Sequence, residues 1–261
     1  MKMSRRAKLA YSLAICMLVL GLTGLNVLLS VQAVALDMDF YMSTWTELDI
    51  PGSAGMSLDD LRLTGERLLG YFVGSEATPQ VTAVVEGAHR PVFREHEIEH
   101  LRDVRHLFRL GFRAKRVCWA MVLTGVLLAG WQSGVPGHHE QRDKRRYLYS
   151  LSLGLGDLIS RSLKVAGLVL VAATVLLSVP ALLDFTRWWT GFHLITFDND
   201  LWRLDPRSDW LIKIFPEEFF SAAVTRIGLY SAAVTAAYIV IGMLLRFSIS
   251  NISPDYGKYN F

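Results

Sequence analysis

The chain has 261 residues, of which 52% are hydrophobic and 20% charged, and its formal net charge is +3. An ordinary soluble domain carries about 25% charged residues, so the composition argues against a disordered tail, and the small basic excess argues against a nucleic-acid partner. The two cysteines, Cys16 and Cys118, are too few for a disulfide scaffold or a multi-cysteine zinc site. Because both lie within apolar runs, we expect each thiol to be a small buried hydrophobic group.

The hydrophobic residues are concentrated in four runs that carry no charge, at residues 9–36, 117–136, 165–183 and 227–245. A helix needs roughly 20 apolar residues to cross the hydrocarbon core of a membrane, and backbone groups in lipid must pair within the segment. The sequence therefore predicts an all-α integral membrane protein with four transmembrane helices and a mainly helical extracytoplasmic loop domain. The first run is much longer than the apolar core of a signal peptide, which has about 7–15 residues, so we expect it to be retained as an anchor.

The distribution of basic residues predicts an orientation. With the N-terminus in the cytoplasm, twelve Lys and Arg residues fall in the inner segments and five in the short third loop outside. Long loops translocate largely regardless of their charge, so the short segments decide. We expect cytoplasmic segments at residues 1–8, 137–164 and 246–261, and extracytoplasmic segments at 37–116 and 184–226, with the active site on the extracytoplasmic face.

The first outer segment has local structure of its own. Ser57 followed by Asp60 resembles a capping box, which predicts a helix over residues 58–69 that stops near Gly70 or Gly74. A β-rich stretch follows at residues 81–85. The apolar spacing over residues 94–115 predicts an amphipathic helix, in which His96, His100 and Asp103 share one face.

One motif on that helix admits more than one function. His96-Glu97-Ile98-Glu99-His100 fits the pattern in which two histidines bind zinc and a glutamate polarises water. A membrane zinc metalloprotease with metal ligands His96 and His100 is therefore one hypothesis, and candidates for its third ligand are Asp103, His106 and His193. In the alternative without metal, Glu97 or Asp103 orients the His100 imidazole and raises its basicity.

The third loop carries a second histidine on the same predicted side of the membrane. His193 follows the third span by about ten residues, in the stretch that continues to Trp202, Asp205 and Pro206. We expect Trp202 to support the site or to anchor at the headgroups, and Asp205 to support it or to build a turn. A bend at Gly111 in the amphipathic helix would bring His100 back toward the bilayer and His193.

These two histidine segments resemble the signatures of a known family. Glu97 to Val104 is similar to an E-x-x-H-[LM]-x-D-V pattern in a family of four-span bacterial membrane proteins that includes the lipoprotein intramolecular transacylase. The family's second signature is similar to the segment from Phe192-His193 through Trp202-Arg203-Leu204-Asp205-Pro206, followed by Phe215-Pro216-Glu217-Glu218-Phe219-Phe220. This resemblance implies a membrane acyltransferase whose catalytic pair is His100 and His193.

The resemblance also implies a substrate. The family moves an acyl chain from the glyceryl sn-2 position of a diacylglyceryl lipoprotein to the amine of its N-terminal cysteine, which makes bacterial lipoproteins and membrane lipids the expected partners. Histidine suits this transfer, because it serves as base and acid near neutral pH. Because donor and acceptor share one molecule, the transfer requires no protein nucleophile. We expect no cofactor. The other functional alternative is a non-catalytic membrane protein that binds a lipid or partner.

Overall fold

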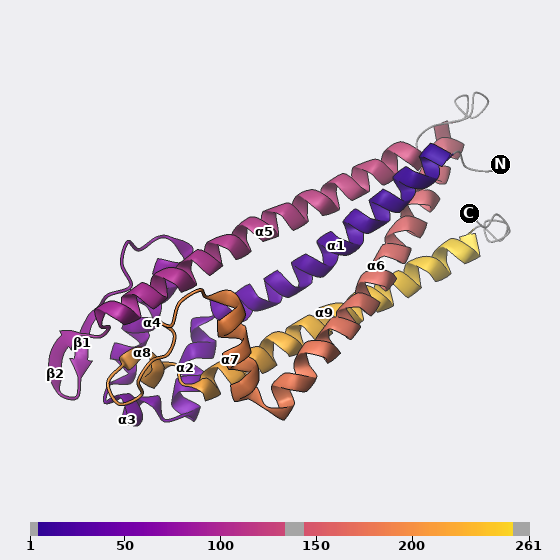
Figure 1. Ribbon diagram of the computed structural model, residues 1–261. Helices are drawn as coiled ribbons and strands as arrows, with labels where there is room; N and C mark the ends of the chain where they lie inside the picture. Colours follow the sequence, from indigo (N-terminus) through magenta and orange to yellow (C-terminus); the bar gives the residue numbers. More distant parts are fainter. Residues whose placement is uncertain (1–4, 134–143, 253–261) are drawn as a thin grey trace. The chain divides into compact units, whose positions relative to one another are not determined.

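Four long helices account for most of the computed structural model, which describes residues 5–133 and 144–252. They are α1 (Arg5–Ala35), α5 (Glu95–Ser133), α6 (Lys144–Leu183) and α9 (Glu217–Ile252) (Figure 1). Each contains a stretch that is long and apolar enough to cross a membrane, and many of its large apolar side chains are exposed, as expected where they face lipid. The prediction of an all-α protein with four transmembrane helices is confirmed. Residues 1–4, 134–143 and 253–261 lie outside the described residues. They include parts of the predicted cytoplasmic segments and the end of the second predicted span.

The chain divides into two compact units, and each long helix contributes residues to both. The first unit comprises residues 1–29, 114–175 and 230–261, and the second comprises residues 30–113 and 176–229. The first therefore consists of segments of the four long helices, whereas the second also contains the shorter elements.

Small residues allow close helix packing in the first unit. A Cβ atom added at Gly21 would lie 2.9 Å from the Cys118 carbonyl oxygen, and one at Gly125 would lie 2.8 Å from Leu18. Such contacts let the backbones of α1 and α5 approach closely, which favours association in lipid. The thiol prediction is wrong for Cys16, which is exposed, and Cys118 is half-buried.

Polar side chains also join helices of the first unit. The buried Asp157 on α6 pairs with Arg161 on the same helix and with Arg246 on α9, and it accepts a hydrogen bond from the Tyr11 hydroxyl on α1. On α1, the Asn26 amide donates to the Thr235 hydroxyl of α9 over 3.1 Å. Pairing of this kind satisfies polar groups that would be costly to bury alone.

The second unit contains most of the buried core. Its shorter elements are α2 (Met38–Glu47), α3 (Ile50–Ala54), α4 (Leu58–Val73), β1 (Thr82–Val85), β2 (Ala88–Pro91), α7 (Phe185–Thr196) and α8 (Trp210–Ile214). Figure 1 shows α2, α3, α4, α8 and the hairpin grouped together. Trp45 lies fully buried in their core, and its indole donates to the Ile214 carbonyl. Trp210 likewise donates to Ala54, which ties α8 to α3.

Several predicted elements of the second unit are present. Ser57 caps α4 by accepting a hydrogen bond from the Asp60 N–H, and the helix ends at Gly74, whose φ is 97°. The β-rich stretch forms β1, which pairs antiparallel with β2. The bend proposed at Gly111 is wrong, because α5 runs through this residue as one helix.

Candidate active site

Helix α7 positions His193. Asp184 caps the helix through a hydrogen bond from the Arg187 N–H, which satisfies one of the free donors of the first turn. The side chains that follow repeat at helical spacing, and they place one aromatic face on α7: Phe185, Trp188, Trp189, Phe192 and His193. His193 at the end of this face is 7% exposed.

Glu97 fixes the start of α5, one turn before His100. Its Oε2 accepts a hydrogen bond from the Arg94 N–H over 2.7 Å, which is the reciprocal half of a capping box. Its Oε1 accepts one from the Leu211 N–H over 2.6 Å, in the first turn of α8. The carboxylate is fully buried, and it therefore supports the site by joining two helix starts, with both oxygens used by backbone donors.

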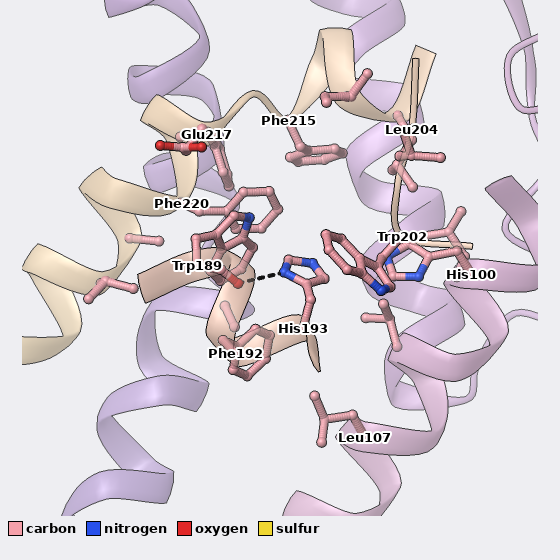
Figure 2. A pocket seen from close by; sticks show the side chains of 18 of the residues that line it. His100, Leu107, Trp189, Phe192, His193, Trp202, Leu204, Phe215, Glu217 and Phe220 are labelled. Atoms are coloured by element: carbon pink, nitrogen blue, oxygen red, sulfur yellow. Dashed lines mark hydrogen bonds between the residues drawn. The ribbon is translucent and has the colours of Figure 1, made fainter. Parts of the chain in front are cut away.

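The structure brings the two histidines of the sequence analysis together. Their ring centroids lie 6.3 Å apart at an interplanar angle of 31°. His193 stacks on Trp202 with 4.7 Å between ring centroids, and Phe197 packs edge-on against His100 at 5.2 Å. Figure 2 shows His193, Trp202 and His100 converging from separate elements. Residues almost a hundred positions apart in the chain thus share one site.

A hydrogen bond fixes the tautomer of His193. The Nδ1 atom lies 2.8 Å from the Trp189 carbonyl oxygen, the dashed contact of Figure 2. A carbonyl only accepts, so Nδ1 carries the proton in the neutral ring and Nε2 keeps its lone pair. His100 differs, because its Nδ1 is buried without a hydrogen-bond partner within the described part of the chain.

Both imidazoles line one apolar pocket of about 550 Å³, a volume in the usual range for small-molecule sites. Its walls are mostly aliphatic and aromatic and come from α1, α2, α4, α5, α7, α8, α9 and the loop after α7. The charged residues among its walls are Arg203 and Glu217, and the Glu217 carboxylate accepts a hydrogen bond from the Thr186 hydroxyl. The pocket therefore suits a hydrocarbon chain beside two imidazoles.

Burial keeps both imidazoles neutral. His100 lies in the polar part of α5, ahead of the apolar run that begins at Val117, and burial together with the nearby His193 lowers its pKa to about 4, although Asp103 opposes the shift. Burial also lowers the pKa of His193, against the hydrogen bond to Trp189. Near neutral pH each ring is thus in its neutral form, with one nitrogen that carries a proton and one that has a lone pair.

Comparisons with known proteins identify the family of the chain. A family profile described as lipoprotein intramolecular transacylase Lit matches residues 15–220. The chain belongs to this family. It is accordingly a membrane transacylase, as the two histidine signatures imply. No curated protein sequence matches the chain.

Solved structures show the same fold. The membrane integral lipoprotein intramolecular transacylase Lit from Bacillus cereus superposes with a TM-score of 0.66 at 17% identity, covering 91% of this chain and 96% of that one. Two variants of the Bacillus cereus protein, in which a histidine is replaced by arginine or by alanine, give TM-scores of 0.61 at the same identity. They cover 91% of this chain and 92% or 94% of their own.

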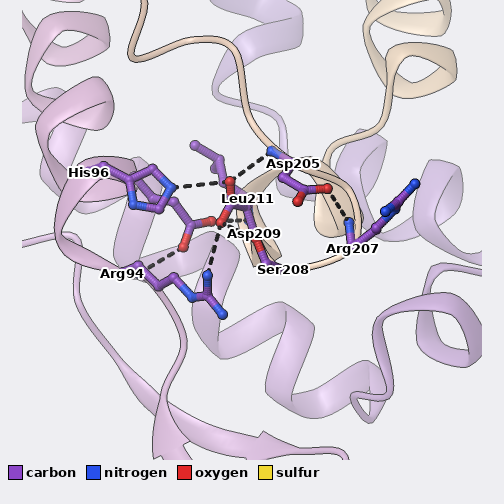
Figure 3. A network of polar contacts seen from close by, with 8 residues as sticks. Arg94, His96, Asp205, Arg207, Ser208, Asp209 and Leu211 are labelled. Carbon is purple, nitrogen blue, oxygen red and sulfur yellow. Dashed lines mark hydrogen bonds and ion pairs between the residues drawn. The ribbon is translucent and has the colours of Figure 1, made fainter.

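The zinc protease hypothesis is not supported. His96 and His100 have different neighbours. His96 Nε2 lies 3.1 Å from the Asp209 carboxylate (Figure 3), whereas His100 and His193 line the apolar pocket. Both oxygens of Glu97, the residue that would polarise a water, already accept backbone hydrogen bonds. Within residues 5–133 and 144–252, no group of three or more His, Cys, Asp or Glu side chains is arranged to hold a metal ion.

Two of the predicted supporting residues, Asp103 and Asp205, form hydrogen bonds with the loop after α7 or within it. Asp103 accepts a hydrogen bond from the Asn199 amide over 2.9 Å, and its charge reaches His100 only through the electrostatic effect on the pKa. Asp205 lies in a turn, where it accepts from the Arg207 N–H and donates its own N–H to Asp209 (Figure 3). Trp202 contacts the His193 ring directly. This contact agrees with the prediction that Trp202 supports the site, rather than with the alternative of a headgroup anchor.

Two site residues were missed in the sequence analysis. The Trp189 carbonyl and the Phe197 ring both contact the histidine pair, yet neither residue was predicted to belong to the site. The aromatic spacing of α7 was the available signal, because side chains that recur at three and four positions share one face of a helix.

We predict that Glu97→Gln lowers the melting temperature of the purified protein in detergent. A glutamine has one acceptor oxygen, so either Arg94 or Leu211 would lose its partner, at a cost of about 1–3 kcal/mol. Glu95→Gln is the matched control, because Glu95 is exposed in the same helical turn. Equal melting temperatures for the two variants would contradict the structural role of Glu97.

We also predict that acidification destabilises the protein. The folded state keeps His100 and His193 neutral, whereas an unfolded chain protonates histidine near pH 6.5, so the unfolded state binds more protons below that pH. This stability is present above about pH 6.5 and is lost as the pH falls toward about 4. The melting temperature of His100→Gln should decrease less between about pH 7.5 and 5 than that of the wild type. His89→Gln, at an exposed position, is the histidine control, and an equal change of slope in both variants would contradict the prediction.

Proposed function

We propose that the chain acts on bacterial lipoproteins, and that it moves an acyl chain from the glyceryl sn-2 oxygen to the α-amine of the N-terminal cysteine in one diacylglyceryl lipoprotein. The observation that carries this proposal is the pair of neutral imidazoles, 6.3 Å apart, in an apolar pocket of about 550 Å³. The pocket takes the acyl chain out of water, and the imidazoles handle the proton that the transfer must move. Membership of the transacylase family supports the same reaction.

In this mechanism His193 is the general base. Its Nδ1–H is held by the Trp189 carbonyl, which leaves Nε2 to take a proton from the attacking amine. The imidazolium that results keeps its hydrogen bond to the Trp189 carbonyl, and it stacks against Trp202 at 4.7 Å. An aromatic face attracts a cation in such a desolvated place, so Trp202 stabilises the charged form of His193.

His100 supports the oxyanion in the same scheme. A neutral imidazole has one N–H donor, and this donor stabilises the negative charge on the carbonyl oxygen of the tetrahedral intermediate. Because the Nδ1 atom of His100 is buried and unpaired within the described residues, a bound substrate supplies the partner that the folded chain does not. Leaving such an atom unpaired costs about 1–3 kcal/mol.

Bonds and protons balance without water. The amine nitrogen attacks the ester carbonyl carbon and gives one proton to His193, the bond from that carbon to the sn-2 oxygen breaks, and His193 returns the proton to the oxygen. The products are an amide and a free hydroxyl on one molecule. The scheme requires no cofactor, because the substrate brings donor and acceptor together.

We predict that His193→Gln and His100→Gln each reduce the rate of transfer by about 10²–10⁴-fold, the usual contribution of a general acid or base. Each variant is expressed in a host that lacks the activity, and mass spectrometry identifies N-acyl S-monoacylglyceryl cysteine at the lipoprotein N-terminus. His89→Gln, at an exposed position of β2, is the matched histidine control. Full conversion by either pocket variant would remove that residue from the mechanism.

We also propose that both termini lie in the cytoplasm and that the second unit faces the extracytoplasmic side. The twelve-to-five distribution of basic residues over the short segments supports this orientation.

We predict that Leu63→Cys reacts with a membrane-impermeant maleimide in intact cells, because Leu63 is exposed on α4 of the second unit. Lys8→Cys, at an exposed position of α1, should react only after the cells are opened. Both variants carry alanine in place of Cys16 and Cys118. The reverse labelling pattern would overturn the orientation.

A further inference from the structure

A second hollow, of about 200 Å³, lies beside the apolar pocket in the second unit. The two share Leu107 and Phe197 as walls, and Phe197 packs edge-on against His100. The other walls of this hollow are mostly polar and come from α5 and from the end of α7 with its following loop: Asp103, His106, Leu110, Thr196, Asp198 and Asn199. We refer to it as the polar hollow.

The substrate of the proposed reaction has two chemically different parts that meet at one cysteine. The diacylglyceryl part is hydrocarbon, which an apolar pocket accommodates. The peptide part carries an N–H and a C=O at almost every residue, and these groups are costly to bury without hydrogen-bond partners. Since the reacting amine belongs to the cysteine itself, the first peptide residues must leave the site close to the two imidazoles.

We infer that the polar hollow binds the first residues of the peptide chain that follow the acylated cysteine of the substrate. This inference rests on the proposed function and adds a second subsite to it. The polar hollow adjoins the apolar pocket, so one substrate reaches both at once.

The side chains of the polar hollow suit an extended peptide. Carboxylate oxygens of Asp103 and Asp198 accept N–H groups, and the Thr196 hydroxyl and the Asn199 amide both donate and accept. Asp103 follows His100 by three residues, about one turn of α5, so its carboxylate lies on the face of the helix that His100 shares. The hydrogen bond from Asn199 to Asp103 holds the loop against α5 and thereby keeps the far wall of the polar hollow in place.

A purely structural role for these residues makes a different prediction from a subsite. If the polar hollow only holds Phe197 and the loop in position, damage to it impairs every substrate equally. If it binds peptide, damage impairs only substrates that carry a peptide. Two substrates separate these cases: a diacylglyceryl lipopeptide of several residues, and the amide of diacylglyceryl cysteine, which has the ester and the amine but no following peptide.

The test fills the polar hollow from one wall. Leu110 lines the polar hollow and not the apolar pocket, and it is 44% exposed, so Leu110→Trp adds bulk without entering the buried core. Leu63→Trp is the matched control, because Leu63 is also 44% exposed and lines neither cavity. His106→Ala is a second variant of the polar hollow, which removes a polar side chain instead of adding bulk.

We expect Leu110→Trp to raise KM for the lipopeptide by about tenfold or more, a change typical of altered fit in a pocket, with kcat and the conversion of the peptide-free amide little changed. His106→Ala should raise KM in the same selective way but less, and Leu63→Trp should match the wild type on both substrates. Equal losses on both substrates, or no loss on either, would overturn the inference while leaving the proposed function intact. A wild type that converts neither substrate would refute the proposed function itself.

Discussion

The site depends on one buried carboxylate. Glu97 accepts hydrogen bonds from the backbone N–H groups of Arg94 and Leu211. It therefore joins the start of α5, which carries His100, to the start of α8, which follows the loop after α7. That loop brings Phe197 and Trp202 against the histidines. A fully buried carboxylate is unfavourable unless its oxygens are paired, and here both are paired with backbone donors whose positions are set by secondary structure. The geometry of the candidate site therefore depends on how two helices begin.

The chemistry of the pocket follows from burial. Two imidazoles in a polar cleft would be partly protonated near neutral pH, and water would compete with the amine for the ester. In an apolar pocket the neutral forms are favoured. Water enters apolar surroundings less readily, so in the proposed reaction amide formation is favoured over hydrolysis. The aromatic walls thus have two roles, because they hold the hydrocarbon chain and they also set the protonation state of the groups that move the proton.

The sequence predicted the parts of the fold that short-range physics determines. Four charge-free runs must be helices in lipid, and Ser57 and Gly74 mark the ends of α4. The four long helices and both ends of α4 are observed. The convergence of His100 and His193 was expected from a family resemblance, since spacing alone does not bring distant segments together. The predicted route to it, a bend at Gly111, was wrong: α5 is continuous, and His193 instead lies on α7, a helix interpreted as loop. Glu97 shows the same limit, because its motif matches a zinc site and only its tertiary contacts reveal a structural carboxylate.

A transferase that acts within one molecule must select a substrate that carries both the donor and the acceptor group. It need not hold two substrates, so binding energy is free to select which molecule enters and to align its ester with its own amine. Hydrocarbon contacts alone discriminate weakly, since every membrane lipid with two acyl chains offers them. Polar contacts discriminate strongly, because a ligand that lacks the matching groups leaves buried polar atoms unpaired. His100, which lines the pocket, has such an atom, because its Nδ1 is buried and unpaired within the described residues. In the proposed reaction an ordinary phospholipid brings an ester but no amine beside it, so it lacks the nucleophile that completes the transfer.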